Sequence, residues 1–223
     1  MGCSFKSLDL LFPRLCLQCE AKLSNTQTLF CTECLGQLSL IERQERCPCC
    51  FAETSGVCTR CRTRRVVIKR QTAACPRFGP AYTLLSYLKK GHIQWLSSAV
   101  SLMVLQWATL KWQRPDLIVP LPFSHFAPHE RELSLLLARQ IAQLIDCPWA
   151  PLLRASFDGR AFLEKGVFQS RYSLRRRHGV FPDGKQRLML VALELSDEKL
   201  RAAAEALQHG FPQEICALAF VAE

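Results

Sequence analysis

Residues 16–61 read CLQCEAKLSNTQTLFCTECLGQLSLIERQERCPCCFAETSGVCTRC, and eight of the thirteen cysteines of the chain stand there in four C-x-x-C pairs. Two thiolates separated by two residues can lie on one tight turn and bind one face of a tetrahedral ion. Four such turns supply two complete sites, so the stretch predicts a double zinc ribbon that holds one or two zinc ions. The eight expected ligands are Cys16, Cys19, Cys31, Cys34, Cys47, Cys50, Cys58 and Cys61.

The spacing leaves two pairings of these turns open. Sequential pairing gives C-x2-C-x11-C-x2-C followed by C-x2-C-x7-C-x2-C, whereas a cross-braced pairing joins the first turn to the third and the second to the fourth. Disulfides are the alternative to metal. The apolar segment 8–12 is too short for a secretory signal and no small-residue cleavage site follows it, so we expect a cytoplasmic protein with zinc. We expect the other cysteines to be packing residues: Cys3, Cys49, Cys75, Cys147 and Cys216.

A length of 223 residues suits one medium domain and a small one. We assign residues 1–75 to the double zinc ribbon with a basic linker, and residues 76–223 to an α/β domain. The ribbon is too poor in apolar residues to fold without its metals. The formal net charge of +10 and the pI near 9.1 favour a polyanionic partner such as nucleic acid.

Six cations lie within eleven residues that begin inside the last cysteine pair, and no acid interrupts them. The run is either a solvated linker or a strip that binds successive phosphates. No aromatic residue lies between these cations, so the run itself does not predict stacking with bases. Its members are Arg60, Arg62, Arg64, Arg65, Lys69 and Arg70.

The rest of the chain alternates between helical and strand patterns. We expect helices over 82–112, 130–145 and 196–209, and buried strands over 116–121, 187–193 and 214–222. This order predicts an α/β domain with a mostly parallel sheet. Residues 95–110 carry no charge, but polar residues interrupt the run, and we interpret it as a buried helix rather than a membrane span.

In a parallel sheet the ligand crevice lies beyond the carboxyl ends of the strands. The candidate here is the turn VALELSDEKL at residues 191–200. A phosphate cradle needs glycine and small hydroxyl residues with free N–H groups, and this turn has no glycine. Ser196 is expected to be the N-cap of the next helix, where Asp197 and Glu198 would complement the helix dipole and repel a phosphate.

The histidines share no ligand spacing and have no nucleophile beside them, so we expect surface or capping roles for them. They are His92, His125, His129, His178 and His209. The residues Trp95, Trp107 and Trp112 are better explained as core than as a stacking platform.

Taken in order, several segments resemble the ComF-type competence proteins. These segments are LDLLFPRLCLQC, the paired cysteine turns, YTLLSYLKKG, the VPLP strand end, QSRYSLRRRHGVF, GKQRLMLV and LRAAAEAL. The resemblance implies a zinc ribbon joined to a phosphoribosyltransferase-like α/β domain, and a role in DNA uptake. It also marks the Lys89-Lys90-Gly91 segment and the cluster Arg171, Arg175, Arg176 and Arg177 as basic elements.

The chain departs from the family where the chemistry would lie. The family usually has a sequence like RGFNQ where this chain has residues 129–133, HEREL. Its diphosphate-binding strand and loop is approximately VDDVxTTGAT, so Ala192 and Leu193 stand in the places of two acids that hold the ribose hydroxyls. Glu194 is not expected to replace them, because a shift of one residue turns a strand side chain to the other face.

The sequence therefore predicts a non-catalytic ComF-like protein that binds single-stranded DNA or docks a DNA-uptake protein. The alternatives are an active phosphoribosyltransferase that uses phosphoribosyl diphosphate with magnesium, and an adaptor that contacts protein only. We expect no catalytic residues under the first hypothesis. The candidate phosphate-binding residues are Arg62, Arg64, Arg65, Lys69, Arg70, Lys89, Lys90, Arg175, Arg176 and Arg177.

Overall fold

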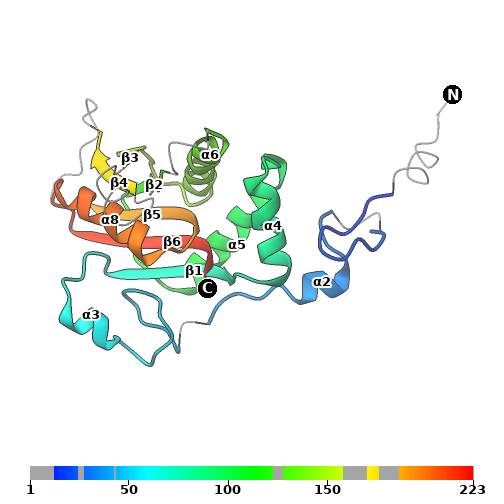
Figure 1. Ribbon diagram of the computed structural model, residues 1–223, viewed down its shortest axis with the longest axis horizontal. Coiled ribbons are helices and arrows are strands. Elements are labelled where there is room, and N and C mark those ends of the chain that lie inside the picture. Colours follow the sequence, from blue (N-terminus) through cyan, green and yellow to red (C-terminus); the bar gives the residue numbers. More distant parts are fainter. Residues whose placement is uncertain are drawn as a thin grey trace.

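The computed structural model describes residues 13–24, 28–42, 44–122, 128–157, 170–175 and 186–222. Within them the chain builds an α/β fold around a parallel four-stranded sheet, which confirms the expected fold class. The strand order is β1-β6-β5-β2 (Figure 1). The bounds are β1 Arg70–Pro76, β2 Leu117–Pro120, β5 Arg187–Glu194 and β6 Glu214–Ala222.

Strand β5 shows why this sheet is covered on both faces. The odd-numbered residues from Met189 to Leu193 pack with α4 (Gly79–Lys89), α5 (Leu96–Thr109) and α6 (Pro128–Leu144). The even-numbered residues from Leu188 to Ala192 pack with α8 (Asp197–Gln208) and with a hairpin of β3 (Leu153–Phe157) and β4 (Ser170–Leu174). A strand buried on both faces is a continuous apolar run, which is the pattern that predicted β5 and β6.

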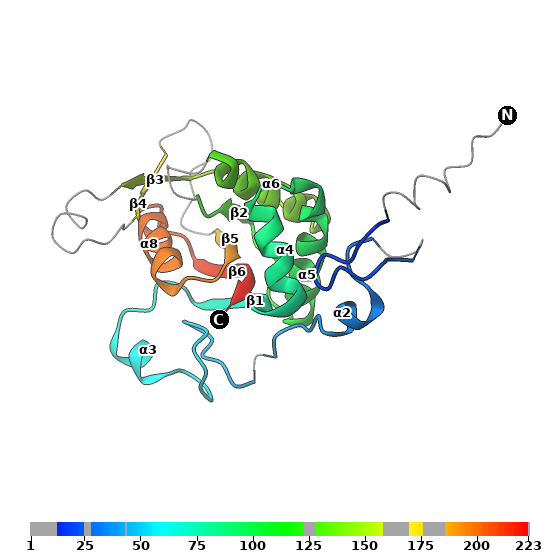
Figure 2. The ribbon, with the colours of Figure 1, turned by 45° about the vertical axis from the view of Figure 1, so that its right-hand side comes forward.

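The two cysteine-rich segments lie on different sides of the α/β domain (Figures 1 and 2). The first, with helix α2 (Thr32–Gly36), packs onto the apolar cluster that contains α4, and Thr83 hydrogen-bonds with Gln18 across this contact. The second, with α3 (Thr59–Thr63), lies along the outer edge of β1. There the N–H of Gln71 donates to the carbonyl of Pro48 at 2.8 Å. The N–H of Ile41 donates to the carbonyl of Ala74 at 2.9 Å.

The predicted helix over 82–112 is two helices. Helix α4 ends at Lys89, and Gly91 follows with a φ of +96°, a conformation that side chains other than glycine rarely adopt. A short 3-10 helix, η2 (Ile93–Trp95), then leads into α5. Helix α5 buries an apolar face, and none of the described helices is long and apolar enough to cross a membrane.

Strand β1 and the β3–β4 hairpin were not predicted. Strand β1 carries the polar residues Gln71 and Thr72, both fully buried, so it lacks the apolar run that marks β5. It also spans residue 75, where we ended the N-terminal segment, and its pairing with β6 makes it part of the sheet. The two-domain division itself stays a prediction.

Glu214 at the start of β6 ties β1 to β6 by charge. Its side chain is only 8% exposed, and it accepts hydrogen bonds from Arg70 at 2.6 Å and 3.0 Å, with Lys69 at 3.7 Å. Burial alone would raise the pKa of this carboxyl. The bonds from Arg70, the Cys216 thiol and the charge of Lys69 outweigh burial, so the pKa lies below its usual value.

We expect Glu214→Gln to lower the free energy of unfolding by about 1–3 kcal/mol at pH 7, because Arg70 loses its charged partner. A carboxyl whose folded-state pKa is depressed stabilises fully above its unfolded pKa of about 4.3 and loses this effect as the pH falls through the folded value. Urea unfolding should therefore show the difference from the wild type shrinking between pH 7 and pH 3. The control Glu205→Gln, which removes an exposed ion pair with Arg201, should change stability by less than about 0.5 kcal/mol. Equal effects for both variants would contradict this role.

Candidate functional site

The eight predicted metal ligands form two clusters of four cysteines. Within each cluster the sulfur atoms all lie within 4.8 Å of one another. The first cluster joins the first two cysteine turns and the second cluster joins the last two, so the pairing is sequential and not cross-braced. The members are Cys16, Cys19, Cys31 and Cys34 in one cluster, and Cys47, Cys50, Cys58 and Cys61 in the other.

Both clusters are built in the same way. In each, the residue before the first cysteine pairs with the residue six positions after that cysteine, as Leu15 does with Lys22 and Arg46 with Glu53. The turn between them closes through a residue with positive φ, Glu20 or Phe51. The third cysteine is the N-cap of a short helix, α2 or α3, which carries the fourth cysteine. The same local fold therefore occurs twice.

The sulfur geometry fits zinc. A tetrahedral ion with zinc–sulfur bonds of about 2.3 Å places its sulfur ligands about 3.8 Å apart. The Cys19 and Cys31 sulfurs are 3.6 Å apart, and the Cys50 and Cys58 sulfurs are 3.5 Å apart. Both separations are far longer than a disulfide bond of about 2.05 Å. Each cluster can thus hold one metal ion, for which four thiolates favour zinc.

The thiols of a cluster differ in acidity. Burial would raise the pKa of Cys16, but hydrogen bonds from the backbone N–H groups of Cys31, Cys19 and Gln18 lower it to about 6. Cys47 has a pKa of about 6 for the same reasons in the second cluster. Burial and the neighbouring thiols raise the pKa of Cys34. Because zinc binds thiolates, metal binding releases the protons of thiols such as Cys34, whose pKa is raised.

We expect two zinc ions per purified chain, one for each cluster. Because a metal site needs its full ligand set, Cys47→Ser should reduce the content to one ion and lower the melting temperature, as measured by native mass spectrometry and thermal unfolding. Cys49→Ser is the matched control, since Cys49 lies in the same turn but its sulfur faces the Lys69 carbonyl, 3.9 Å away. Loss of zinc from Cys49→Ser, or a single ion in the wild type, would overturn the assignment.

A cavity of about 460 Å³ lies beyond the carboxyl ends of β1, β5 and β6, where the architecture predicts a ligand crevice. Ala192 and Leu195 of the predicted turn line it, and Tyr172 contributes from β4. Among the described residues, the charged ones in its wall are three cations and two carboxylates: Arg77, Lys89, Lys199, Glu194 and Asp197.

Glu194 is directed into this cavity, contrary to our expectation. Residues two apart on a strand share a face, so Glu194 lies on the side of Ala192, whereas Leu193 packs into the apolar cluster on the other side. Its carboxylate forms an ion pair with Lys89, and it lies 3.4 Å from a terminal nitrogen of Arg77. The two cations nearest to it therefore share one carboxylate of the chain itself.

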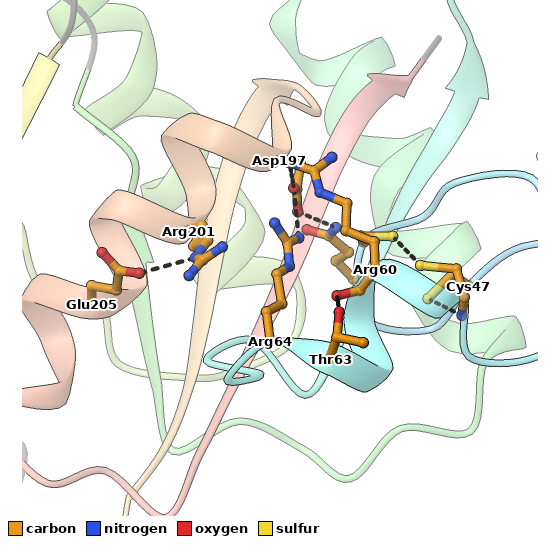
Figure 3. A network of polar contacts seen from close by, with 10 residues as sticks. Cys47, Arg60, Thr63, Arg64, Asp197, Arg201 and Glu205 are labelled. Carbon is orange, nitrogen blue, oxygen red and sulfur yellow. Dashed lines mark hydrogen bonds and ion pairs between the residues drawn. The ribbon is translucent and has the colours of Figure 1, made fainter.

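Asp197, the first residue of α8, joins the cavity to the second cysteine cluster (Figure 3). Its carboxylate accepts a hydrogen bond from Arg64 at 2.8 Å, and Arg60 lies 3.8 Å away. Buried Gln71 of β1 donates to the other carboxylate oxygen at 3.4 Å. The bond to Asp197 raises the pKa of Arg64. Ser196 holds the N-cap position, as predicted, although its side chain makes no capping bond.

The predicted phosphate-binding residues do not form one surface. Arg64, Lys69, Arg70 and Lys89 are in ion pairs with acids of the chain. Arg62 and Arg65 are exposed beside the second cluster, and Lys90 is exposed at the end of α4. Arg175 is half-buried after β4, where its N–H donates to Leu152. Arg176 and Arg177 lie outside the described residues.

The sequence interpretation missed Arg77, Lys199 and Tyr172 as residues of the cavity. Arg77 directly follows β1, so recognising that strand would have placed it at the edge of the sheet. Lys199 lies in the first turn of α8, next to the predicted turn. Tyr172 reaches the cavity from a hairpin that carries no strong sequence signal.

Neither a family model nor a curated protein matches the chain. Among solved structures, the purine phosphoribosyltransferase from Pyrococcus horikoshii is similar, with a TM-score of 0.37 and 14% sequence identity. That match covers 56% of this chain and 82% of the archaeal enzyme.

Proposed function

We propose that the protein is a non-catalytic relative of the ComF-type proteins that binds single-stranded nucleic acid through its basic zinc-ribbon surface. The observation that carries this proposal is the chemistry of the strand ends. Carboxylates stand where a phosphoribosyltransferase needs a phosphate-binding loop, and the nearby cations are paired with them. DNA uptake as the process, and the cytoplasmic location, stay predictions from the sequence.

Several contacts argue against phosphoribosyl transfer. Positioning and charge stabilisation supply most of the catalysis for a phosphorylated sugar substrate. Here Ala192 and Leu193 are buried apolar residues and cannot bind ribose hydroxyls or a magnesium ion. At the start of α8, Asp197 faces the cavity with a charge of the same sign as the substrate. The active enzyme is therefore the less favoured function.

The surface of α3 supports contact with nucleic acid. The side chain of Arg60 is 70% exposed, and Arg62 and Arg65 are exposed on the same short segment. Guanidinium groups bind phosphate in a bidentate manner and release counterions from the backbone. The bond from Arg64 to Asp197 fixes this segment on the α/β domain, so the remaining arginines are presented from a rigid base.

We expect the double variant Arg62→Gln/Arg65→Gln to weaken binding of a single-stranded 20-mer and to reduce the salt dependence of its affinity by about 1–1.5 charges. Fluorescence anisotropy at several salt concentrations measures both quantities. The control Arg131→Gln/Arg139→Gln removes the same charge from α6, on the other side of the sheet from α3 in Figures 1 and 2. If both double variants changed the affinity and its salt dependence equally, the α3 arginines would contribute only through the net charge of the protein. A wild type that does not bind at low salt would refute the nucleic-acid function and leave the protein adaptor.

Because Glu194 pairs with cations of the cavity, we expect removal of its charge to let the cavity bind an anion. We expect millimolar inorganic diphosphate to leave the melting temperature of the wild type unchanged and to raise that of Glu194→Gln by about 2–4 °C, because Lys89 then loses its carboxylate partner. Glu194→Asp keeps the charge and serves as the control. If phosphoribosyl diphosphate with magnesium stabilises the wild type, the enzyme hypothesis replaces this one.

A further inference from the structure

Three aromatic rings meet where α4 ends. The centroid of Tyr87 lies 5.3 Å from that of His92 and 5.2 Å from that of Trp95, and the rings of His92 and Trp95 stack at 5.5 Å with an angle of 19° between their planes. We call Tyr87, Lys90, His92 and Trp95 the aromatic turn. Sequence reasoning assigned Trp95 to the core and His92 to the surface, and did not bring them together.

The backbone holds these rings in a fixed arrangement. The N–H of His92 donates to the carbonyl of Tyr87 at 3.1 Å, and that of Gly91 donates to Leu88 at 3.0 Å. The positive φ of Gly91 turns the chain so that His92 comes back over the last turn of α4. Trp95 packs partly against the apolar cluster that contains α4 and α5, so the aromatic turn has a rigid base. A ligand that stacks on it would need little ordering of the protein.

The outer side of the aromatic turn is accessible and basic. His92 is exposed, while Tyr87 and Trp95 are half-buried, so the rings are not simply core. The ammonium group of Lys90 lies 5.6 Å from the centroid of Tyr87 and is exposed. The segment YLKKGHIQW at residues 87–95 contains no acid. Lys89, which precedes Lys90, points instead to Glu194 and lines the cavity.

Stacked aromatic rings beside a cation suit a ligand with a flat ring and a negative charge. An unpaired nucleotide has both, since its base presents a π-face and its phosphate follows at short range. A duplex hides the faces of its bases in its own stack and would meet only the charge. We propose that the aromatic turn binds an unpaired nucleotide, with the base against His92 and Trp95 and the phosphate at Lys90.

This inference rests on the proposed nucleic-acid function but concerns a different surface from the arginines of α3. Helices α3 and α4 are well separated in both ribbon views (Figures 1 and 2). The α3 arginines bind phosphate without regard to the base, whereas the aromatic turn responds to the base itself. A strand that reaches both surfaces would be held by charge at one and by stacking at the other.

The test compares a 12-mer of thymidine with a 12-mer of the same length and charge that lacks bases, using fluorescence anisotropy. We expect His92→Ala and Trp95→Leu each to weaken binding of the thymidine 12-mer by about 5- to 50-fold and to leave the abasic 12-mer unchanged. Lys90→Gln should reduce the salt slope for both ligands by about one charge. Phe211→Ala, which removes a ring that is 79% exposed between α8 and β6, should change neither affinity.

Circular dichroism and melting curves identify a variant that fails to fold, and His92→Ala keeps the test decisive because His92 is exposed. A uridine RNA 12-mer should lose affinity in the same variants, since stacking requires only a base, and a duplex should not. If the wild type binds the thymidine and abasic 12-mers equally, or if His92→Ala binds as the wild type does, the inference is wrong while the α3 function stands. If the wild type binds neither 12-mer, both fail.

Discussion

Four thiolates within 4.8 Å of one another repel unless a cation lies among them, and the N-terminal part of the protein depends on this constraint. A metal ion held by each cluster would supply free energy that stabilises these turns. The second cluster also fixes α3, which brings Arg64 to Asp197. The position of Arg64 beside Asp197 therefore depends on a cysteine cluster outside the sheet.

Ion pairs between distant segments replace a ligand at those strand ends. Glu194 ends β5 and Asp197 begins α8, and their cations come from α4, from the residue after β1 and from the segment after α3. A cavity that binds an anion keeps its cations unpaired or pairs them with the ligand. Here the chain provides the anions itself, which lowers the electrostatic attraction for a second one. The fold retains a crevice in which Lys89 and Arg77 are paired with Glu194.

The sequence predicted the features that depend on local pattern. The cysteine spacing predicted the ligands, and continuous apolar runs predicted β5 and β6. It did not predict contacts between residues far apart in the chain, such as Arg64 with Asp197, which lie 133 positions apart. For the same reason a basic run looked available for phosphate although several members have internal partners. Strand β1 was not predicted because its buried residue Gln71 is polar. The cysteine spacing left the pairing of the turns open, and only the positions of the sulfur atoms in three dimensions decide it.

Strand β1 is at the edge of the sheet, and such an edge offers unpaired backbone groups to other chains. The segment that leads into the second cysteine cluster and the first turn of that cluster cover it, through the hydrogen bonds of Ile41 with Ala74 and of Gln71 with Pro48. Pro48 directly follows Cys47, so an ion held by the second cluster would help to keep this cover in place. Metal binding by the cysteines would in this way also limit strand-to-strand association between molecules.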